Sequence, residues 1–195
     1  QFLAHFQACQ SDAQYEVTPL AVGQRSLKNC CLAYLTRLHH EDYYRLAEAQ
    51  FNSADNMTDQ LGSLSAMVDE VSTIRDEMLD AFYQQWSDTP LVVDKWFRLQ
   101  ASVHNEQALE LVKKLEQHPA FNMKNPNRVR SLLGPFQHNV KAFHHTSGQG
   151  YEFLADKIIQ LDSTNPQIAS RMAHALLGWK KLVPEQGEKM KQQIL

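Results

Sequence analysis

Two polar side chains near the C-terminal end, Gln167 and Arg171, have the types and spacing to bind a carboxylate or a peptide carbonyl. They stand in the stretch STNPQIASRM, in which Asn-Pro is typical of a helix start. Side chains four residues apart lie one turn apart on a helix. The free N–H groups and the macrodipole of a helix N-terminus favour anionic or carbonyl oxygens, which a guanidinium and an amide can hold. The structural alternative is that Arg171 pairs with a core Asp or Glu and that Gln167 satisfies a backbone group.

The apolar period predicts one helix from Asn165 to Trp179 around this pair. A broad apolar face would carry Ile168, Met172, Ala175, Leu176 and Trp179, a second apolar side Ala169, Ala173 and Leu177, and a narrow polar edge Gln167, Arg171, His174 and Gly178. A helix that is apolar on two sides is expected between two layers of the fold. We therefore expect its polar edge to be the part that meets a ligand.

The rest of the chain predicts an all-α fold. Apolar residues recur with the helical period in residues 27–38, 43–51, 57–68, 71–82, 90–99, 109–115, 126–136 and 151–161. Asn125-Pro126 and Asn165-Pro166 each open such a segment, and their separation of 40 residues lies in the range of HEAT and armadillo repeats. We expect stacked antiparallel helical hairpins that form an α-solenoid.

Composition and motifs exclude several classes of function. The formal charge is −3 without a dense basic stripe, which argues against nucleic-acid binding, and no apolar run is long enough to span a membrane. Three cysteines, two of them adjacent, do not resemble a disulfide framework and favour a reducing compartment. The pairs His39-His40 and His144-His145 lack the spacing of zinc ligands and are interpreted as solvated helix ends. No metal site and no catalytic residue is predicted in this chain.

Four strings carry a family resemblance: NMTDQLGSLSAMV (56–68), LVVDKWFRLQA (91–101), NMKNPNRVRSLLGPF (122–136) and GQGYEFLADKIIQLDSTNPQIASRM (148–172). With them the chain resembles the C-terminal helical domain of bacterial aminopeptidase N, a zinc-dependent metallo-aminopeptidase of the gluzincin group. The resemblance covers residues 24–195, which are expected to form the cap domain, truncated at its C-terminus. Residues 1–23 look like the end of a preceding segment that packs onto this domain.

The resemblance implies a non-catalytic cap that closes over the active site of a peptidase acting on short peptides. Zinc and the catalytic groups would belong to the catalytic domain of the same polypeptide, so this chain alone is expected to be inactive. Gln167 and Arg171 match family residues that reach into the substrate chamber, and Arg128 and Arg130 match a motif interpreted as channel-lining or domain-packing. The implied location is cytoplasmic, with peripheral association with the inner membrane left open. The alternative is a free-standing helical-repeat scaffold that binds a partner protein.

Overall fold

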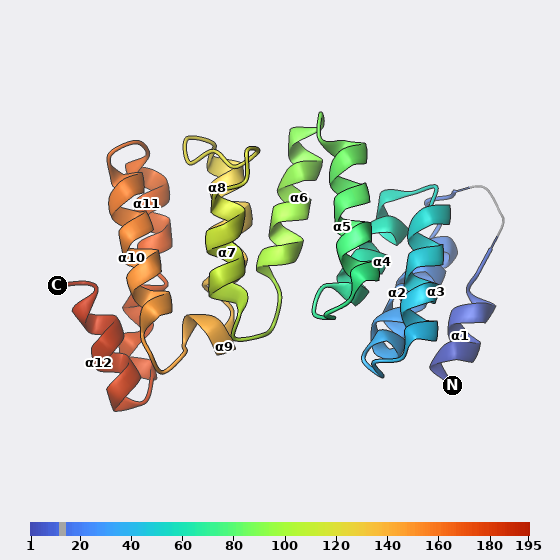
Figure 1. Ribbon diagram of the computed structural model, residues 1–195, viewed down its shortest axis with the longest axis horizontal. Coiled ribbons are helices and arrows are strands. Elements are labelled where there is room, and N and C mark those ends of the chain that lie inside the picture. Colours follow the sequence, from blue (N-terminus) through green and yellow to red (C-terminus); the bar gives the residue numbers. More distant parts are fainter. Residues whose placement is uncertain (12–14) are drawn as a thin grey trace. The chain divides into compact units, whose positions relative to one another are not determined.

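The chain is helical over the residues that the computed structural model describes, which are 1–11 and 15–195 (Figure 1). In this described part the structure contains twelve α-helices, one 3-10 helix and no strand. The predicted all-α, solenoid-like class is therefore confirmed. The chain divides into two compact units, unit 1 (Gln1–Gln85) and unit 2 (Trp86–Leu195), and each is described by itself.

Unit 1 is built from a short first helix and four longer helices. Its helices are α1 (Phe2–Ala8), α2 (Pro19–Thr36), α3 (Glu41–Ser53), α4 (Met57–Met67) and α5 (Thr73–Trp86), the last of which ends on the first residue of unit 2. Helix α4 packs against both α2 and α3, and α1 packs against α2. Leu32, Leu64 and Phe82 are completely or almost completely buried in the resulting core. The predicted boundary between residues 23 and 24 falls inside α2, and it stays a prediction.

Unit 2 holds the remaining helices. They are α6 (Pro90–Ala101), α7 (Ala108–Glu116), α8 (Pro126–Phe136), α9 (Val140–Phe143), α10 (Gln149–Asp162), α11 (Pro166–Ala173), the 3-10 helix η1 (Leu176–Lys181) and α12 (Pro184–Gln192). Helix α6 packs on α8, and α10 and α11 form a hairpin whose helices lie side by side (Figure 1). Phe136 makes edge-to-face contacts with Phe143 and Phe153, which join α8, α9 and α10 in one apolar core.

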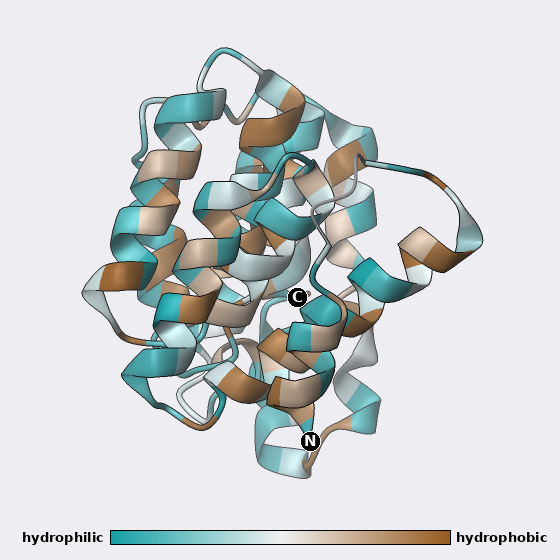
Figure 2. Ribbon diagram, turned by 90° about the vertical axis from the view of Figure 1, so that its right-hand side faces the viewer, coloured by the Kyte–Doolittle hydropathy of each residue, from teal (hydrophilic) through white to brown (hydrophobic). Residues whose placement is uncertain are grey.

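Local sequence signals explain where several helices begin. The Oδ1 atom of Asn125 accepts hydrogen bonds from the N–H groups of Asn127 and Arg128, and that of Asn165 accepts one from Ile168. Each cap satisfies N–H groups that have no partner inside the helix. Both Asn-Pro helix starts are thereby confirmed. Hydrophobic residues recur at intervals along the helices rather than in continuous blocks, as expected of amphipathic elements (Figure 2).

The turn between α9 and α10 is a place where the backbones come unusually close. Gly148 has a φ of +81°, a left-handed conformation that glycine adopts without strain. Two residues later, a Cβ atom on Gly150 would lie only 2.6 Å from the carbonyl oxygen of Phe143. The start of α10 can therefore pack directly against the end of α9 only because position 150 has no side chain.

Candidate functional site

Helix α11 presents Gln167 and Arg171 on its outer side. Asn165 caps the helix, and Ile168, Ala169 and Met172 bury its inner side. Gln167 and Arg171 are both exposed and lie one turn apart. Within the described residues, neither side chain makes a hydrogen bond or an ion pair. The amide and the guanidinium are thus available to a ligand, and their role stays a prediction.

The helix that carries this pair is shorter than the apolar period predicts. Helix α11 ends at Ala173, His174 is its C-terminal cap, and the chain then tightens into η1. A 3-10 helix turns about 120° per residue rather than about 100°, so Gly178 leaves the predicted polar edge. The prediction of a single helix to residue 179 with a four-residue edge is therefore wrong. Leu177 is 60% exposed, so this end of the segment is not sandwiched between layers either.

Packing against α12 accounts for the tighter winding after α11. The carbonyl oxygen of Trp179 approaches Gly187 of α12 so closely that a Cβ atom there would lie 2.7 Å from it. Leu176, the first residue of η1, is buried, which anchors the start of the tightened segment. Helix η1 therefore packs against α12, with the Trp179 backbone at the point of closest approach, and does not continue the face of α11.

The short helix also changes the electrostatics expected at the pair. Gln167 lies in the first turn of α11, where N–H groups favour an oxygen acceptor, but Arg171 lies in the last turn. The macrodipole there stabilises a cation and adds nothing to the attraction of an anion. Any anion bound at Arg171 would be held by the guanidinium charge itself.

Arg128 is in a different situation, because its guanidinium is enclosed inside unit 2. Its Nε atom donates to Oδ1 of Asp94 at 2.6 Å, and both side chains are 10% exposed or less. Its Nη1 atom donates to the carbonyl oxygen of Ala120 at 2.8 Å and its Nη2 atom to that of Pro90 at 3.3 Å. The guanidinium carbon lies 4.9 Å from the centre of the Phe97 ring, a cation–π contact. These contacts join α6, α8 and the loop between α7 and α8.

Arg130 lies on the same helix but is half-buried. Its Nε atom donates to the carbonyl oxygen of Pro126 at 3.1 Å. Together with Arg98 it borders a shallow hollow of about 320 Å³ at the C-terminal ends of α6 and α8, which is also lined by Ser102, Gly134, Pro135 and His138. Arg98 lies in the last turn of α6, where the macrodipole stabilises a positive side chain. The assignment of Arg128 and Arg130 to channel lining or domain packing stays a prediction.

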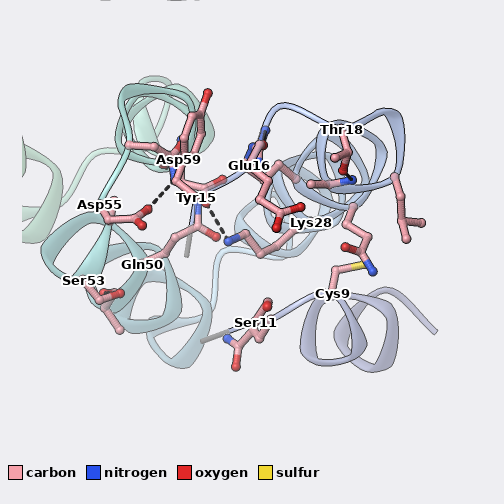
Figure 3. A pocket seen from close by; sticks show the side chains of 18 of the residues that line it. Cys9, Ser11, Tyr15, Glu16, Thr18, Lys28, Gln50, Ser53, Asp55 and Asp59 are labelled. Carbon is pink, nitrogen blue, oxygen red and sulfur yellow. Dashed lines mark hydrogen bonds and ion pairs between the residues drawn. The ribbon is translucent and has the colours of Figure 1, made fainter. Parts of the chain in front are cut away.

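Unit 1 contains a polar hollow that the sequence patterns do not predict. It has a volume of about 590 Å³ and lies between the α1–α2 connection and helices α2, α3 and α4. Figure 3 shows Lys28 and Asp59 facing each other, with Nζ 2.8 Å from Oδ2. Asn29 donates a second hydrogen bond to the Asp59 carboxylate, and Gln50 donates one to Asn29. This network ties α2 to α3 and α4.

The Asp59 carboxyl group responds to two opposing effects. Burial raises its pKa, but the hydrogen bonds from Lys28, Asn56 and Asn29 outweigh burial, so the pKa is lowered below its ordinary value. Asp59 therefore stays ionised at neutral pH and serves as the centre of a charge-assisted network. From the sequence, Asp59 is recognisable only as a favourable acidic residue in the first turn of a helix. Its ion pair with Lys28 is not recognisable there, because Lys28 is 31 residues away.

One histidine of each pair contacts a buried acidic or phenolic group. Nδ1 of His39 lies 2.7 Å from Oε2 of the buried Glu70, which also accepts from the hydroxyl of Tyr44. Burial, together with Glu70, raises the pKa of Tyr44 to about 12.

His144 is half-buried, and its Nδ1 atom lies 2.9 Å from the hydroxyl of Tyr151. Burial lowers the pKa of His144. This histidine is therefore not the solvated helix end expected from the sequence. Within residues 1–11 and 15–195, no group of three or more His, Cys, Asp or Glu side chains is placed to hold a metal ion.

Comparisons with known proteins identify the family. The whole chain, residues 1–195, matches a family described as "Domain of unknown function (DUF3458_C) ARM repeats". The chain is 40% identical over 181 residues to the aminopeptidase N of Haemophilus influenzae and 41% identical over 182 residues to that of Escherichia coli. Each match covers 92% of this chain and 21% of the relative. The chain thus spans about a fifth of the length of these curated relatives.

A solved structure has the same fold. The crystal structure of Legionella pneumophila aminopeptidase A in complex with aspartic acid matches with a TM-score of 0.90 and 30% sequence identity, over 99% of this chain and 24% of that one. In the described part of this chain, no helix is long and apolar enough to cross a membrane. The resemblance to the C-terminal helical domain of aminopeptidase N is confirmed, and the chain belongs to the DUF3458_C family of ARM-repeat domains.

Proposed function

We propose that this chain is the C-terminal cap of a zinc-dependent aminopeptidase that removes N-terminal amino acids from short peptides. In this proposal the cap closes the chamber over the catalytic domain of the same polypeptide and restricts which substrates can enter. In this proposal the zinc ion and its ligands belong to that catalytic domain. The names of the relatives support the peptidase activity, and the proposed location is cytoplasmic.

The cap contributes Gln167 and Arg171 to substrate binding. The observation that carries this step is the exposed guanidinium of Arg171, which has no ion-pair partner among the described residues. The guanidinium of Arg128, in contrast, is already committed to Asp94. In the proposal, Arg171 attracts the carboxyl end of a short peptide or a carbonyl near it, and the Gln167 amide bonds a neighbouring peptide group.

The test is Arg171→Ala in the full-length polypeptide. A hydrogen bond to a charged group contributes about 1.5–3 kcal/mol, so KM for di- and tripeptides should rise about 10- to 150-fold. KM for a single-residue chromogenic amide, which has no carboxyl end to bind, should change little. The matched control is Arg45→Ala, which removes an exposed arginine from α3 in unit 1. Equal changes of KM for both substrates would contradict the role of Arg171.

A second test addresses the cap itself. The 195-residue chain alone should release no amino acid from short peptides, and mixing it with the remainder of the parent polypeptide should restore release. Hydrolysis by the isolated chain would overturn the proposal. A free-standing scaffold, the alternative function, predicts instead that the remainder is fully active without this chain.

A further inference from the structure

The hollow at the C-terminal ends of α6 and α8 is lined by basic side chains and by no acid. Arg98 comes from the last turn of α6, Arg130 from α8 and His138 from the turn that follows α8. The remaining lining residues are uncharged: Ser102, Gly134 and Pro135. Because a guanidinium stays charged at every physiological pH, the hollow concentrates positive charge at one place in unit 2.

These basic groups lack the counterions that other arginines of the chain have. Four arginines each form an ion pair with an acid: Arg37, Arg45, Arg75 and Arg128. Among the described residues, Arg98, Arg130 and His138 form none. Asp94 lies one turn before Arg98 on the same helix and would be its ordinary partner, but it is bound to Arg128. The buried pair of unit 2 therefore leaves Arg98 without a counterion.

Arg130 is held in place by its backbone contact. The side chain is half-buried, and its Nε atom donates to the carbonyl oxygen of Pro126 at 3.1 Å. Its two Nη groups make no hydrogen bond within the part of the chain that the structure describes. The N–H groups of a guanidinium form a planar fork that matches two oxygens of a phosphate or carboxylate. Arg130 thus has donors to spare and an anchored base.

Hydrogen bonds also reduce the repulsion that an anion would meet at these helix ends. Free carbonyl oxygens give a helix C-terminus its negative potential. The hydroxyl of Ser102 donates to the carbonyl oxygen of Arg98 at 2.7 Å, so this oxygen is not free. The buried Asn139 donates from Nδ2 to the carbonyl oxygen of Val103 at 2.5 Å. This second bond joins the segment after α6 to the turn after α8, which fixes the two walls of the hollow.

We propose that this hollow binds a phosphate group, with Arg98 and Arg130 as donors from two helices and His138 as a third donor when it is protonated. A phosphate group carries about −1.5 to −2 charges at pH 7 and three strong acceptor oxygens, which suits several converging cations. A single carboxylate would be satisfied by one guanidinium fork. The volume of about 320 Å³ lies at the lower end of the range for small-molecule sites. The ligand is therefore inorganic phosphate or a small phosphate ester.

Gly134 allows the charge of the site to be changed without altering a basic residue. It lines the hollow, and a Cβ atom built there would meet open space. Gly134→Asp places a carboxylate beside the cations, and Gly134→Asn is the uncharged control of the same shape. In the full-length polypeptide, we expect the Kd for inorganic phosphate to be at least about tenfold higher in Gly134→Asp than in Gly134→Asn. Isothermal titration calorimetry measures it, and equal Kd values would overturn the proposal.

A second pair of variants tests the donor itself. Arg130→Gln removes the anchored guanidinium, so the Kd for inorganic phosphate should rise at least about tenfold. Arg45→Gln is the matched control at an exposed arginine of unit 1 and should leave this Kd within about twofold of its original value. Phosphate bound elsewhere in the polypeptide would contribute equally to both variants. Similar Kd values for the two variants would contradict the role of Arg130.

The choice of anion identifies the ligand. Tighter binding of glycerol 3-phosphate than of inorganic phosphate would support a phosphate ester, and the reverse order would support free phosphate. Acetate bound as tightly as either, or no binding of either phosphate, would overturn the proposal. None of these measurements uses peptidase activity. Their failure would therefore leave the proposed function of the chain untouched.

Discussion

Helices α8 and α11 begin alike but hold their arginines differently. Each helix starts at an Asn-Pro pair whose asparagine caps the first turn. In α8, Arg128 turns inward and donates to Asp94 and to two backbone carbonyl oxygens. In α11, Arg171 is exposed and has no such partner among the described residues.

The difference comes from the neighbouring helix rather than from the local sequence. Helix α6 places Asp94 beside α8, whereas α10 packs on α11 through its apolar residues without supplying an acid to Arg171. A buried guanidinium needs a full set of acceptors because desolvation is costly, but an exposed one needs none. One arginine is thereby committed to the fold, and the other is left available for binding.

The largest expected effect is that of Arg128→Ala. Removing the guanidinium leaves the Asp94 carboxylate buried without its cation, so the free energy of unfolding of unit 2 should fall by about 3–5 kcal/mol. Urea unfolding of the polypeptide measures the change. Arg171→Ala is the matched control and should change it by less than about 0.5 kcal/mol. Equal losses of stability in the two variants would mean that the contrast between the helices has no energetic basis.

Asp59→Asn extends the comparison to the buried pair of unit 1 and should have an intermediate effect. Because the folded-state pKa of Asp59 is lowered from 3.8, its ionised form stabilises the fold above about pH 4, and this contribution is lost as the pH falls through the folded-state pKa. We expect Asp59→Asn to cost about 1.5–3 kcal/mol at pH 7 and to weaken the acid dependence. The control is Asp80→Asn, at an exposed acid of α5. An unchanged pH dependence of thermal unfolding in Asp59→Asn would contradict this assignment.

Gln167→Glu should have the smallest effect on stability. It also distinguishes most clearly between an effect on stability and an effect on peptide binding. A carboxylate in the first turn of α11 is favoured by the macrodipole and can pair with Arg171 one turn away, which together should add about 0.5–1 kcal/mol. The same pairing occupies the guanidinium, so KM for short peptides should rise in the full-length enzyme. A stabilised variant with unchanged peptide KM would show that the α11 pair does not meet the substrate.

The sequence predicts the local features of this molecule well. The apolar period and the caps at Asn56, Asn125 and Asn165 depend on residues within three or four positions, so the all-α fold and these helix starts follow from the sequence directly. The exposure of the α11 pair could not be derived in this way. It depends on whether any distant carboxylate is brought to Arg171 by packing.

Long-range partners are the features that the sequence patterns miss. The spacing of Asp94 and Arg98 suggests a pair on one helix, but Asp94 binds Arg128, which is 34 residues away. The buried partner has priority because an ion pair gains more from a water-excluded site than from the surface of a helix. The early end of α11 has the same cause, since contacts with α12, formed by a later segment, tighten residues 176–181.

The close approach at Gly150 has a consequence for how this domain can vary. Even alanine would force a methyl group against the backbone oxygen of Phe143, and a backbone atom cannot rotate away as a flexible side chain can. Position 150 should therefore admit glycine alone among functional descendants of this sequence. A descendant with any other residue at position 150 would also need a longer turn between α9 and α10.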